Sequence, residues 1–549
     1  MASKGESFFL RTLLLLVALG SSQGKEFDGY REASTFPSTA PAKGYDYIIV
    51  GGGTAGCPLA ATLSQNFSVL VLERGGAPYG NVNVSYMQNF HISLADTSPY
   101  SASQAFVSTD GVINARARVL GGGTCINAGF YTRANARFLA QAGWDAELVN
   151  ESYPWVEKQI VRWPALVAWQ RALRDGLLEA GISPFNGYTY DHLYGTKVGG
   201  TIFNKDGYRH TAADLLSSGN RRNLHVLVHA TVHRIVFDRS GRRPRAVGVV
   251  FYDEHGVRHR AFLKKRKNSE VILSAGAIGS PQMLLLSGIG PKSHLRKMNI
   301  SVVLHNKFVG KGIKKPVEQS LIQTVGITKG GSFIEASSGF GQSPDSIKRH
   351  HGIMSAERGH SGVHQRKEGP PTRGLPRGFL LEKIVGPLSR GHLALVNVDP
   401  SSNPAVTFNY FSHPEDLRRC VYGVRTMAKI ARTKHYADLA VDKFTMEMLL
   451  NMTVKANVNL IPKHVNDTSS LEQFCRDTVI TIWHYHGGCH VGQVVDSAHR
   501  VLGVSRLRVV DGSTFATSPG TNPQGTVMMM GRYMGVKLLR KRLGRGAMV

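Results

Sequence analysis

Short apolar runs alternate with glycine-rich turns in several parts of the chain. Residues 45–50 (YDYIIV) and 69–72 (VLVL) are rich in the residue types that favour β-strands. Between them lie a glycine turn and a stretch, through residue 64, that is typical of a helix. A third strand-like run, 271–273, precedes a second predicted helix. This order of strand, turn, helix and strand predicts an α/β fold.

The first turn has the spacing of a dinucleotide-binding site. Gly51, Gly53 and Gly56 form a G-x-G-x-x-G motif directly after the first strand, and the second strand ends at Glu73. Gly51 permits the tight turn, Gly53 lets backbone amides approach a pyrophosphate, and Gly56 lets the helix pack on the strand. Glu73 can accept hydrogen bonds from ribose hydroxyls. The alternative is a purely structural glycine turn, and the motif alone does not separate FAD from NAD.

Later segments add to this predicted site. A second glycine-rich turn, 118–127 (RVLGGGTCIN), brings bare backbone close to a planar ring. The segment 276–290 continues from the third strand as a helix, and the C-terminal part of the chain holds the polar segments 483–488, 509–512 and 521–524.

The N-terminus has the features of a secretory signal peptide. Lys4 and Arg11 precede a short apolar run, 12–20, and small residues follow this run up to position 24. An amphipathic anchor is the alternative. In the oxidising compartment that secretion implies, Cys420 and Cys475 can pair as a disulfide, or they remain two free buried thiols. Glycosylation sequons begin at six asparagines: Asn66, Asn83, Asn150, Asn299, Asn451 and Asn466. We therefore expect a secreted glycoprotein, extracellular or in the cell wall.

Charge adds one further expectation. The chain of 549 residues has 66 Lys and Arg against 38 Asp and Glu, a formal net charge of +28. Such a charge attracts polyanions, so a cell-wall polyanion is an expected partner. Nucleic acid is not, because no basic helix with interleaved aromatics is present. We expect no metal site, since no zinc-ligand spacing occurs, and no integral membrane segment, since no run is long and apolar enough.

Together these segments resemble the glucose–methanol–choline (GMC) family of flavoprotein oxidoreductases. Within that family, HTAADLL (210–216), TIWHYHGG (481–488) and SPGTNPQGT (518–526) are most similar to plant HOTHEAD-like and mandelonitrile lyase-like members. The resemblance implies an α/β fold, with an FAD-binding Rossmann-like domain and an α+β substrate domain that contains an antiparallel sheet. The implied FAD-binding domain comprises 44–150, 225–305 and 479–549, and the substrate domain comprises 151–224 and 306–478, after a signal peptide at 1–24.

The same resemblance implies FAD as the cofactor and assigns its contacts. They fall into four groups, from the pyrophosphate and adenosine to the isoalloxazine and ribityl ends. The residues are Gly51, Gly53, Thr54, Ala55 and Gly56; Glu73, Arg74 and Val232; Thr124, Asn127, Ala128 and Gly129; and Trp483, His484, Asp511, Gly512, Asn522, Pro523 and Gln524.

Family chemistry implies that a base removes the hydroxyl proton of an alcohol while a hydride moves to the flavin. A histidine suits this role, and His486 occupies the implied base position, with His484 as a second candidate. Asn522 occupies the second catalytic position, where it can orient the hydroxyl but cannot take a proton. The implied activity is oxidation of a primary alcohol, with a long-chain ω-hydroxy fatty acid for cuticle lipids as substrate. The alternative is a hydroxynitrile (mandelonitrile) lyase, which favours a second ionisable group where this chain has Asn522.

Two segments depart from the family pattern. Residues 308–320 (FVGKGIKKPVEQS) are about a dozen shorter than the run that passes close to the flavin in the family. Residues 357–378 are basic, rich in Gly and Pro, and nearly free of large apolar residues, which predicts a disordered loop. These departures leave an inactive or FAD-poor paralogue as a further alternative.

Overall fold

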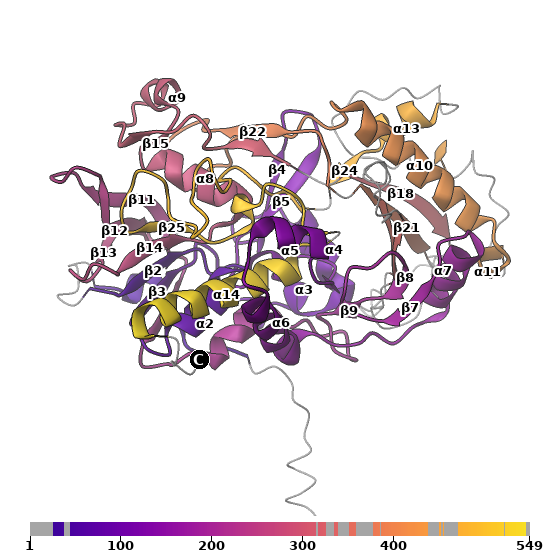
Figure 1. Cartoon of the computed structure of the whole chain (residues 1–549), viewed down its shortest axis with the longest axis horizontal. Coiled ribbons are helices and arrows are strands. Elements are labelled where there is room, and N and C mark those ends of the chain that lie inside the picture. Colours follow the sequence, from indigo (N-terminus) through magenta and orange to yellow (C-terminus); the bar gives the residue numbers. More distant parts are fainter. Residues whose placement is uncertain are drawn as a thin grey trace, which may run out of the picture.

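The computed structural model describes most of the chain, and every structural statement below concerns these residues (Figure 1). They are 26–37, 44–314, 317–324, 334–338, 351–357, 377–384, 386–437, 450–451, 454, 470–481, 483–520 and 522–544. The predicted signal peptide, Asn466 and nearly all of 357–378 lie outside them.

A six-stranded parallel sheet forms the first half of the molecule. Its strands, in spatial order, are β1 (Tyr30–Glu32), β10 (Leu224–Val228), β3 (Val69–Leu72), β2 (Tyr47–Val50), β14 (Glu270–Leu273) and β25 (Leu507–Val509). The three predicted strands are thus central and adjacent. Strands β2, β3 and β25 are buried throughout, as expected for a sheet covered on both faces.

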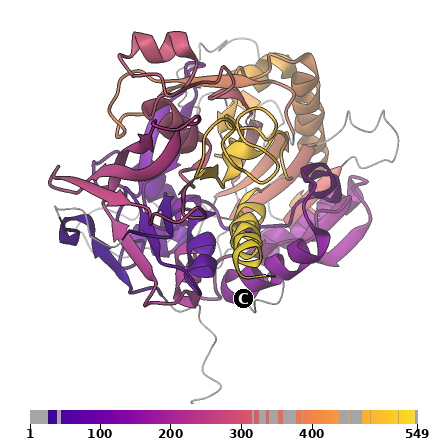
Figure 2. The same ribbon diagram turned by 60° about the vertical axis from the view of Figure 1, so that its left-hand side comes forward.

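The two faces of this sheet pack against different partners. Ile48 and Val50 of β2 point into a core shared with a three-stranded antiparallel sheet: β11 (Thr231–Asp238), β12 (Arg245–Tyr252) and β13 (Arg258–Phe262). Tyr47 and Ile49 point into the opposite core, which α2 (Gly56–Leu63) and α14 (Gln524–Leu543) cover. The methionines of α14 are buried there and belong to this core. Helix α14, yellow in Figures 1 and 2, packs on α2 and on α6 (Ala146–Ile160).

A seven-stranded sheet forms the second half and confirms the predicted antiparallel sheet. Its order is β24 (Ile480–Thr481), β18 (Val317–Thr324), β21 (Arg377–Ile384), β20 (His351–Glu357), β19 (Ile334–Ser338), β8 (Gly195–Val198) and β7 (Phe185–Tyr188); only the last pair, β7 with β8, is parallel. Helices α7 (Ala168–Glu179), α10 (Pro414–Ala431), α11 (Lys434–Ala437) and α13 (Leu471–Asp477) lie along this half, on the right in Figure 1.

A disulfide joins two of these helices. Cys420 of α10 and Cys475 of α13 are bonded and fully buried, so the predicted pairing is confirmed. The other three cysteines, Cys57, Cys125 and Cys489, are free and buried.

The remaining elements are shorter. The strands are β4 (Ser103–Val107), β5 (Ile113–Ala117), β6 (Phe130–Tyr131), β9 (Gly200–Thr201), β15 (Ile289–Gly290), β16 (Leu304–His305), β17 (Lys311–Ile313), β22 (Gly391–Ala394) and β23 (Ala405–Thr407). The helices are α3 (Val82–Ser85), α4 (Phe90–Ala95), α5 (Ala136–Ala142), α8 (Gly276–Leu286) and α9 (Lys292–Lys297), with 3-10 turns η1 (Ala33–Thr35), η2 (Met87–Asn89), η3 (Gly122–Cys125), η4 (Ala212–Ser218) and η6 (Gly512–Thr514). Within the part of the chain that the structure describes, no helix has the length and apolar character needed to cross a membrane.

Candidate active site

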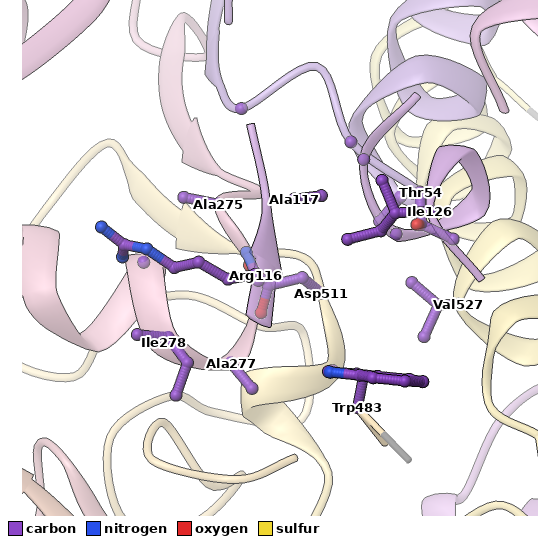
Figure 3. A pocket seen from close by; sticks show the side chains of 18 of the residues that line it. Thr54, Arg116, Ala117, Ile126, Ala275, Ala277, Ile278, Trp483, Asp511 and Val527 are labelled. Atoms are coloured by element: carbon purple, nitrogen blue, oxygen red, sulfur yellow. The ribbon is translucent and has the colours of Figure 1, made fainter. Parts of the chain in front are cut away.

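One cavity of about 510 Å³ lies where the carboxyl ends of β2, β3 and β14 meet segments from the rest of the chain. Figure 3 shows side chains from the first glycine turn (Thr54), the second (Ile126), strand β5 (Arg116) and the C-terminal segments (Trp483 and Asp511) around it. The volume is within the range of cofactor and ligand sites, and the carboxyl edge of a parallel sheet is where such sites form.

The first glycine turn has the geometry that its motif predicts. Gly51 has a φ of +100°, which side chains rarely adopt. A Cβ on Gly56 would lie 2.0 Å from the Gly51 carbonyl oxygen, so only glycine lets α2 start this close to β2. A Cβ on Gly53, in contrast, would meet no atom nearer than 3.7 Å. Gly51, Gly53, Thr54 and Ala55 line the cavity, and Gly56 lies beneath it.

Glu73 and Arg74 line the cavity at the end of β3. The Glu73 carboxylate accepts hydrogen bonds from the amides of Gly52 (3.0 Å) and Gly75 (2.9 Å), and its burial raises its pKa. Arg74 donates to Gln104 Oε1 (2.5 Å) and to the Ala117 carbonyl (3.0 Å), and burial lowers its pKa to about 10. Both side chains are therefore held in fixed positions.

Arg116 is a cavity residue that the sequence did not single out. It is 7% exposed, and its Nε and Nη1 donate to Gln104 Oε1 (3.1 Å) and Gln282 Oε1 (2.9 Å). Its Nη2 is buried and has no hydrogen-bond partner among the described residues. Burial and the neighbouring Arg74 lower its pKa. A buried donor without an acceptor favours a bound group that supplies one.

The second glycine turn contributes Asn127, Ala128 and Gly129 to the cavity, but not Thr124. Thr124 is fully buried behind the wall: its Oγ1 donates to the Gly121 carbonyl (2.7 Å) and accepts from the Ala212 amide (2.9 Å). Its predicted place beside the cofactor is therefore not what the structure shows, because this hydroxyl braces the turn instead.

Arg209 holds the same turn in place and was not predicted. Its guanidinium is 2% exposed and donates to the carbonyls of Val84 (2.8 Å), Thr124 (3.1 Å) and Asn127 (2.6 Å). The sequence signal for it is its position directly before the HTAADLL segment (210–216).

The remaining predicted cofactor contacts converge on the cavity. Val232 lies at the start of β11, and Asp511, Gly512, Pro523 and Gln524 come from the C-terminal segments. Asp511 is tied to α8, because its Oδ2 accepts from the Gly276 amide (2.9 Å) and Ser280 Oγ (2.5 Å); its burial raises its pKa. Gln524 Oε1 accepts from Asn127 Nδ2 (2.9 Å), which joins the C-terminal segment to the second glycine turn.

The structure brings His484, not His486, to the cavity. His486 is 2% exposed, and its backbone pairs with Lys314 in an antiparallel bridge that turns its side chain inward. Its Nε2 is buried without a partner among the described residues, and its Nδ1 lies 3.2 Å from the His484 carbonyl oxygen. Burial is the main reason that its pKa falls to about 3. An imidazole with so low a pKa is a weak base, and of the two candidate histidines only His484 lines the cavity.

The backbone that carries these two histidines is irregular. Trp483 has a φ of +57°, which is uncommon for a side chain of this size, and Gly487 and Gly488 also have positive φ. Trp483, His484 and Tyr485 all line the cavity in succession. Such an irregular segment has no periodicity from which the inward-facing residue could be read.

Asn522 lines the cavity as predicted, and it contacts a residue that was not predicted. Lys383 of β21 donates from Nζ to Asn522 Oδ1 over 2.9 Å and is fully buried. No cluster of His, Cys, Asp or Glu suited to a metal ion occurs in the described part of the chain.

These residues fit a flavin dinucleotide. The open space at Gly53 admits a phosphate close to the backbone. The buried Arg116 Nη2 can donate to an acceptor on the cofactor. The side chains of Ile126, Trp483 and Val527 in the cavity wall can pack on a ring. The site thus has a polar end beneath the parallel sheet and an aromatic, amide-bearing end near the second sheet.

Comparison with known proteins identifies the class. GMC oxidoreductase family models match residues 45–318 and 387–531. The chain therefore belongs to the GMC oxidoreductase family of FAD-dependent enzymes, and FAD is its cofactor.

Individual relatives narrow the placement within the family. The chain is 58% identical to the Protein HOTHEAD of Arabidopsis thaliana, over 98% of this chain and 99% of that one, and 48% identical to an (R)-mandelonitrile lyase-like protein of the same plant, over 91% and 90%. The alignment with HOTHEAD spans 587 positions, more than the length of this chain, so it contains gaps. Among solved structures, a formate oxidase superimposes with a TM-score of 0.73 at 17% identity, covering 91% of this chain and 99% of that one.

Proposed function

We propose that this protein oxidises a primary alcohol to an aldehyde, with His484 as the base and Asn522 as the hydrogen-bond donor to the alcohol oxygen. The observation that carries the proposal is the pairing of one imidazole and one amide in the wall of the FAD cavity. When bound, FAD supplies the hydride acceptor. An amide at the second position can stabilise a developing alkoxide but cannot exchange a proton, which suits oxidation.

The surroundings of His484 favour this role. Apolar and aromatic side chains, among them Ile126, Trp483 and Val527, line the same cavity and limit water around the reacting oxygen. The neighbouring imidazole of His486 does not compete for the proton, because burial lowers its pKa to about 3 and keeps it neutral.

We further propose a long-chain ω-hydroxy fatty acid as the substrate. The similarity to HOTHEAD over nearly the whole chain supports this choice, because the resemblance to HOTHEAD-like members implies such a substrate. An alcohol at the end of a long alkyl chain also suits a cavity with apolar walls.

Anaerobic flavin reduction tests the proposal. The purified protein should be yellow, and adding a 16-carbon ω-hydroxy acid without oxygen should bleach its flavin absorption, whereas the matching fatty acid without the hydroxyl should not. Colourless protein would favour the FAD-poor alternative, and a flavin that no primary alcohol bleaches would overturn the proposal.

A hydroxynitrile lyase is the second candidate, favoured by the 48% identity to the mandelonitrile lyase-like protein. A lyase would release cyanide from mandelonitrile without any change in the flavin spectrum. Measuring cyanide and flavin absorption in the same sample separates the two activities.

We also propose that the protein is secreted and binds a cell-wall polyanion. Support comes from the disulfide, which an oxidising compartment favours, and from the sequons: none of the five sequon asparagines in the described residues is buried. Exposed cations cluster near β13, at Arg258, Arg260, Lys265, Arg266 and Lys267. Retention on immobilised polygalacturonate should fall with salt and should weaken when Lys265, Arg266 and Lys267 are changed to Glu. Equal retention of that variant would contradict this surface.

A further inference from the structure

A buried lysine lies directly behind the cavity. Lys383 is fully buried on β21, the third strand of the seven-stranded sheet, 139 positions before Asn522 in the chain. Its Nζ donates to Asn522 Oδ1 over 2.9 Å and lies 5.1 Å from the centre of the Phe130 ring. Asn522 and Phe130 line the cavity, and Lys383 does not. Any effect of the lysine on the cavity is therefore transmitted through Asn522 and Phe130.

The chemistry of the contact fixes the amide. A lysine ammonium has three donors and no acceptor, so only the oxygen of the Asn522 amide can face it. The Nδ2 group must then lie on the opposite edge of the same planar amide, away from Lys383. If the amide turned over, two donors would face each other at hydrogen-bond distance, which is unfavourable for buried groups.

We propose that Lys383 is a positioning residue that sets the orientation of Asn522, so that Asn522 Nδ2 donates to the substrate's hydroxyl oxygen as His484 takes its proton. This inference rests on the proposed alcohol oxidation. The oxygen that loses its proton gains negative charge, and a donor fixed in advance stabilises that charge more than one that must reorient. Loss of Lys383 removes a contact that requires the Asn522 oxygen to face away from the alcohol, and an amide that turned over would set two oxygens against each other.

The same sheet provides a matched control. Lys197 on β8 is 1% exposed, and its Nζ donates to Thr132 Oγ1 (2.6 Å) and the Asp191 carbonyl (2.7 Å). Neither acceptor lines the cavity. Changing Lys197 to Met removes a buried lysine from the same sheet without removing the contact between Lys383 and Asn522. This variant therefore measures how far loss of a buried lysine destabilises the sheet, separately from any effect on Asn522.

The test measures flavin reduction by the primary alcohol in Lys383→Met, Lys197→Met, Asn522→Ala and the double variant Lys383→Met/Asn522→Ala, each normalised to bound FAD. We expect Lys383→Met to lower the rate of reduction at saturating alcohol about 10- to 100-fold, and to weaken apparent substrate affinity by no more than about fivefold. Lys383→Arg should recover much of the rate, since arginine also only donates. Lys197→Met should keep the rate per flavin.

The double variant decides whether Lys383 acts through Asn522. If it does, Lys383→Met should have no further effect once Asn522 is alanine. Effects that multiply, or a Lys383→Met enzyme with the wild-type rate, would overturn the proposal.

A binding measurement separates this inference from the proposed function. A tertiary alcohol has no hydride to lose, yet its oxygen can accept from Asn522 Nδ2, and its binding can be followed as a shift of the flavin spectrum. We expect its affinity to fall about fivefold in Lys383→Met and to stay unchanged in Lys197→Met, a difference typical of one hydrogen bond. If wild-type flavin is not reduced by any alcohol but this difference holds, the oxidation fails and the positioning role stands; equal affinities would overturn the positioning role.

Discussion

The two halves of the molecule contribute to one cavity in different ways. In the parallel-sheet half, the motif from Gly51 to Glu73 lies within one strand–helix–strand unit, and its three glycines have the backbone geometry that their spacing predicts. In the half built on the seven-stranded sheet, Lys383 reaches Asn522 from 139 positions away, and His484 lies in an irregular segment between them. Local motifs therefore predict where the cofactor binds, whereas residues that act on the substrate depend on tertiary packing.

The largest expected effect is on the rate of flavin reduction, and it distinguishes His484 from His486. His484→Ala should lower the rate of flavin reduction about 10²- to 10⁴-fold, the usual contribution of a general base. His486→Gln should keep the rate within about threefold, because its ring lies outside the cavity and is neutral. Stopped-flow flavin reduction of both variants, with FAD content measured, checks this. A large loss in His486→Gln with full FAD, and none in His484→Ala, would restore the original assignment.

Particular residues show how far the sequence could predict this site. The three glycines and Glu73 were recognisable because a tight turn, a close helix start and a strand end each demand a residue type. The sequence alone could not decide between His484 and His486, because two histidines at i and i+2 share one motif and the irregular backbone beside them, with a positive φ at Trp483, has no local signal. Lys383, Arg116 and Arg209 carried no signal either, since a single cation in a strand or loop reads as a solvated side chain until its packing is known.

The disulfide belongs to the seven-stranded half, so its loss should affect that half most. Cys420→Ser/Cys475→Ser opens a link across 55 positions, which in the chain-entropy model costs about 4 kcal/mol of unfolding free energy. We expect a clear drop in melting temperature, seen by calorimetry, and a smaller drop in the temperature of FAD release, seen by flavin fluorescence. A reductant should reproduce the change in the wild type and have no effect on the variant. Equal shifts in both signals would mean that the two halves unfold as one unit.

A smaller effect tests the parallel-sheet half. In Gly56→Ala the new Cβ would lie 2.0 Å from the Gly51 carbonyl oxygen, so α2 must shift relative to β2. We expect a loss of about 1–3 kcal/mol, the usual cost of overpacking, together with faster loss of FAD on dialysis. Gly241→Ala is the control, because its Cβ would meet only the Arg243 carbonyl oxygen at 4.0 Å. Full FAD retention in Gly56→Ala would show that the start of α2 is not part of the cofactor site.

The smallest effect concerns the decrease in the free energy of unfolding at acid pH. A buried neutral imidazole contributes to this decrease, and a solvated one does not. Burial is the main reason that the pKa of His486 falls from 6.5 to about 3 in the folded chain, and the neighbouring Lys314 and His490 lower it further. Between these values the unfolded chain takes up a proton that the folded chain refuses, so the free energy of unfolding falls as pH drops below 6.5. The slope from one such group is at most about 1.4 kcal/mol per pH unit. Denaturant unfolding from pH 7 to pH 4 should give a flatter acid limb for His486→Gln than for the wild type. Some slope should remain, because burial also lowers the pKa of His499, in the parallel-sheet half, to about 4. An unchanged limb would mean that His486 reaches solvent and that its exclusion as the base must be reconsidered.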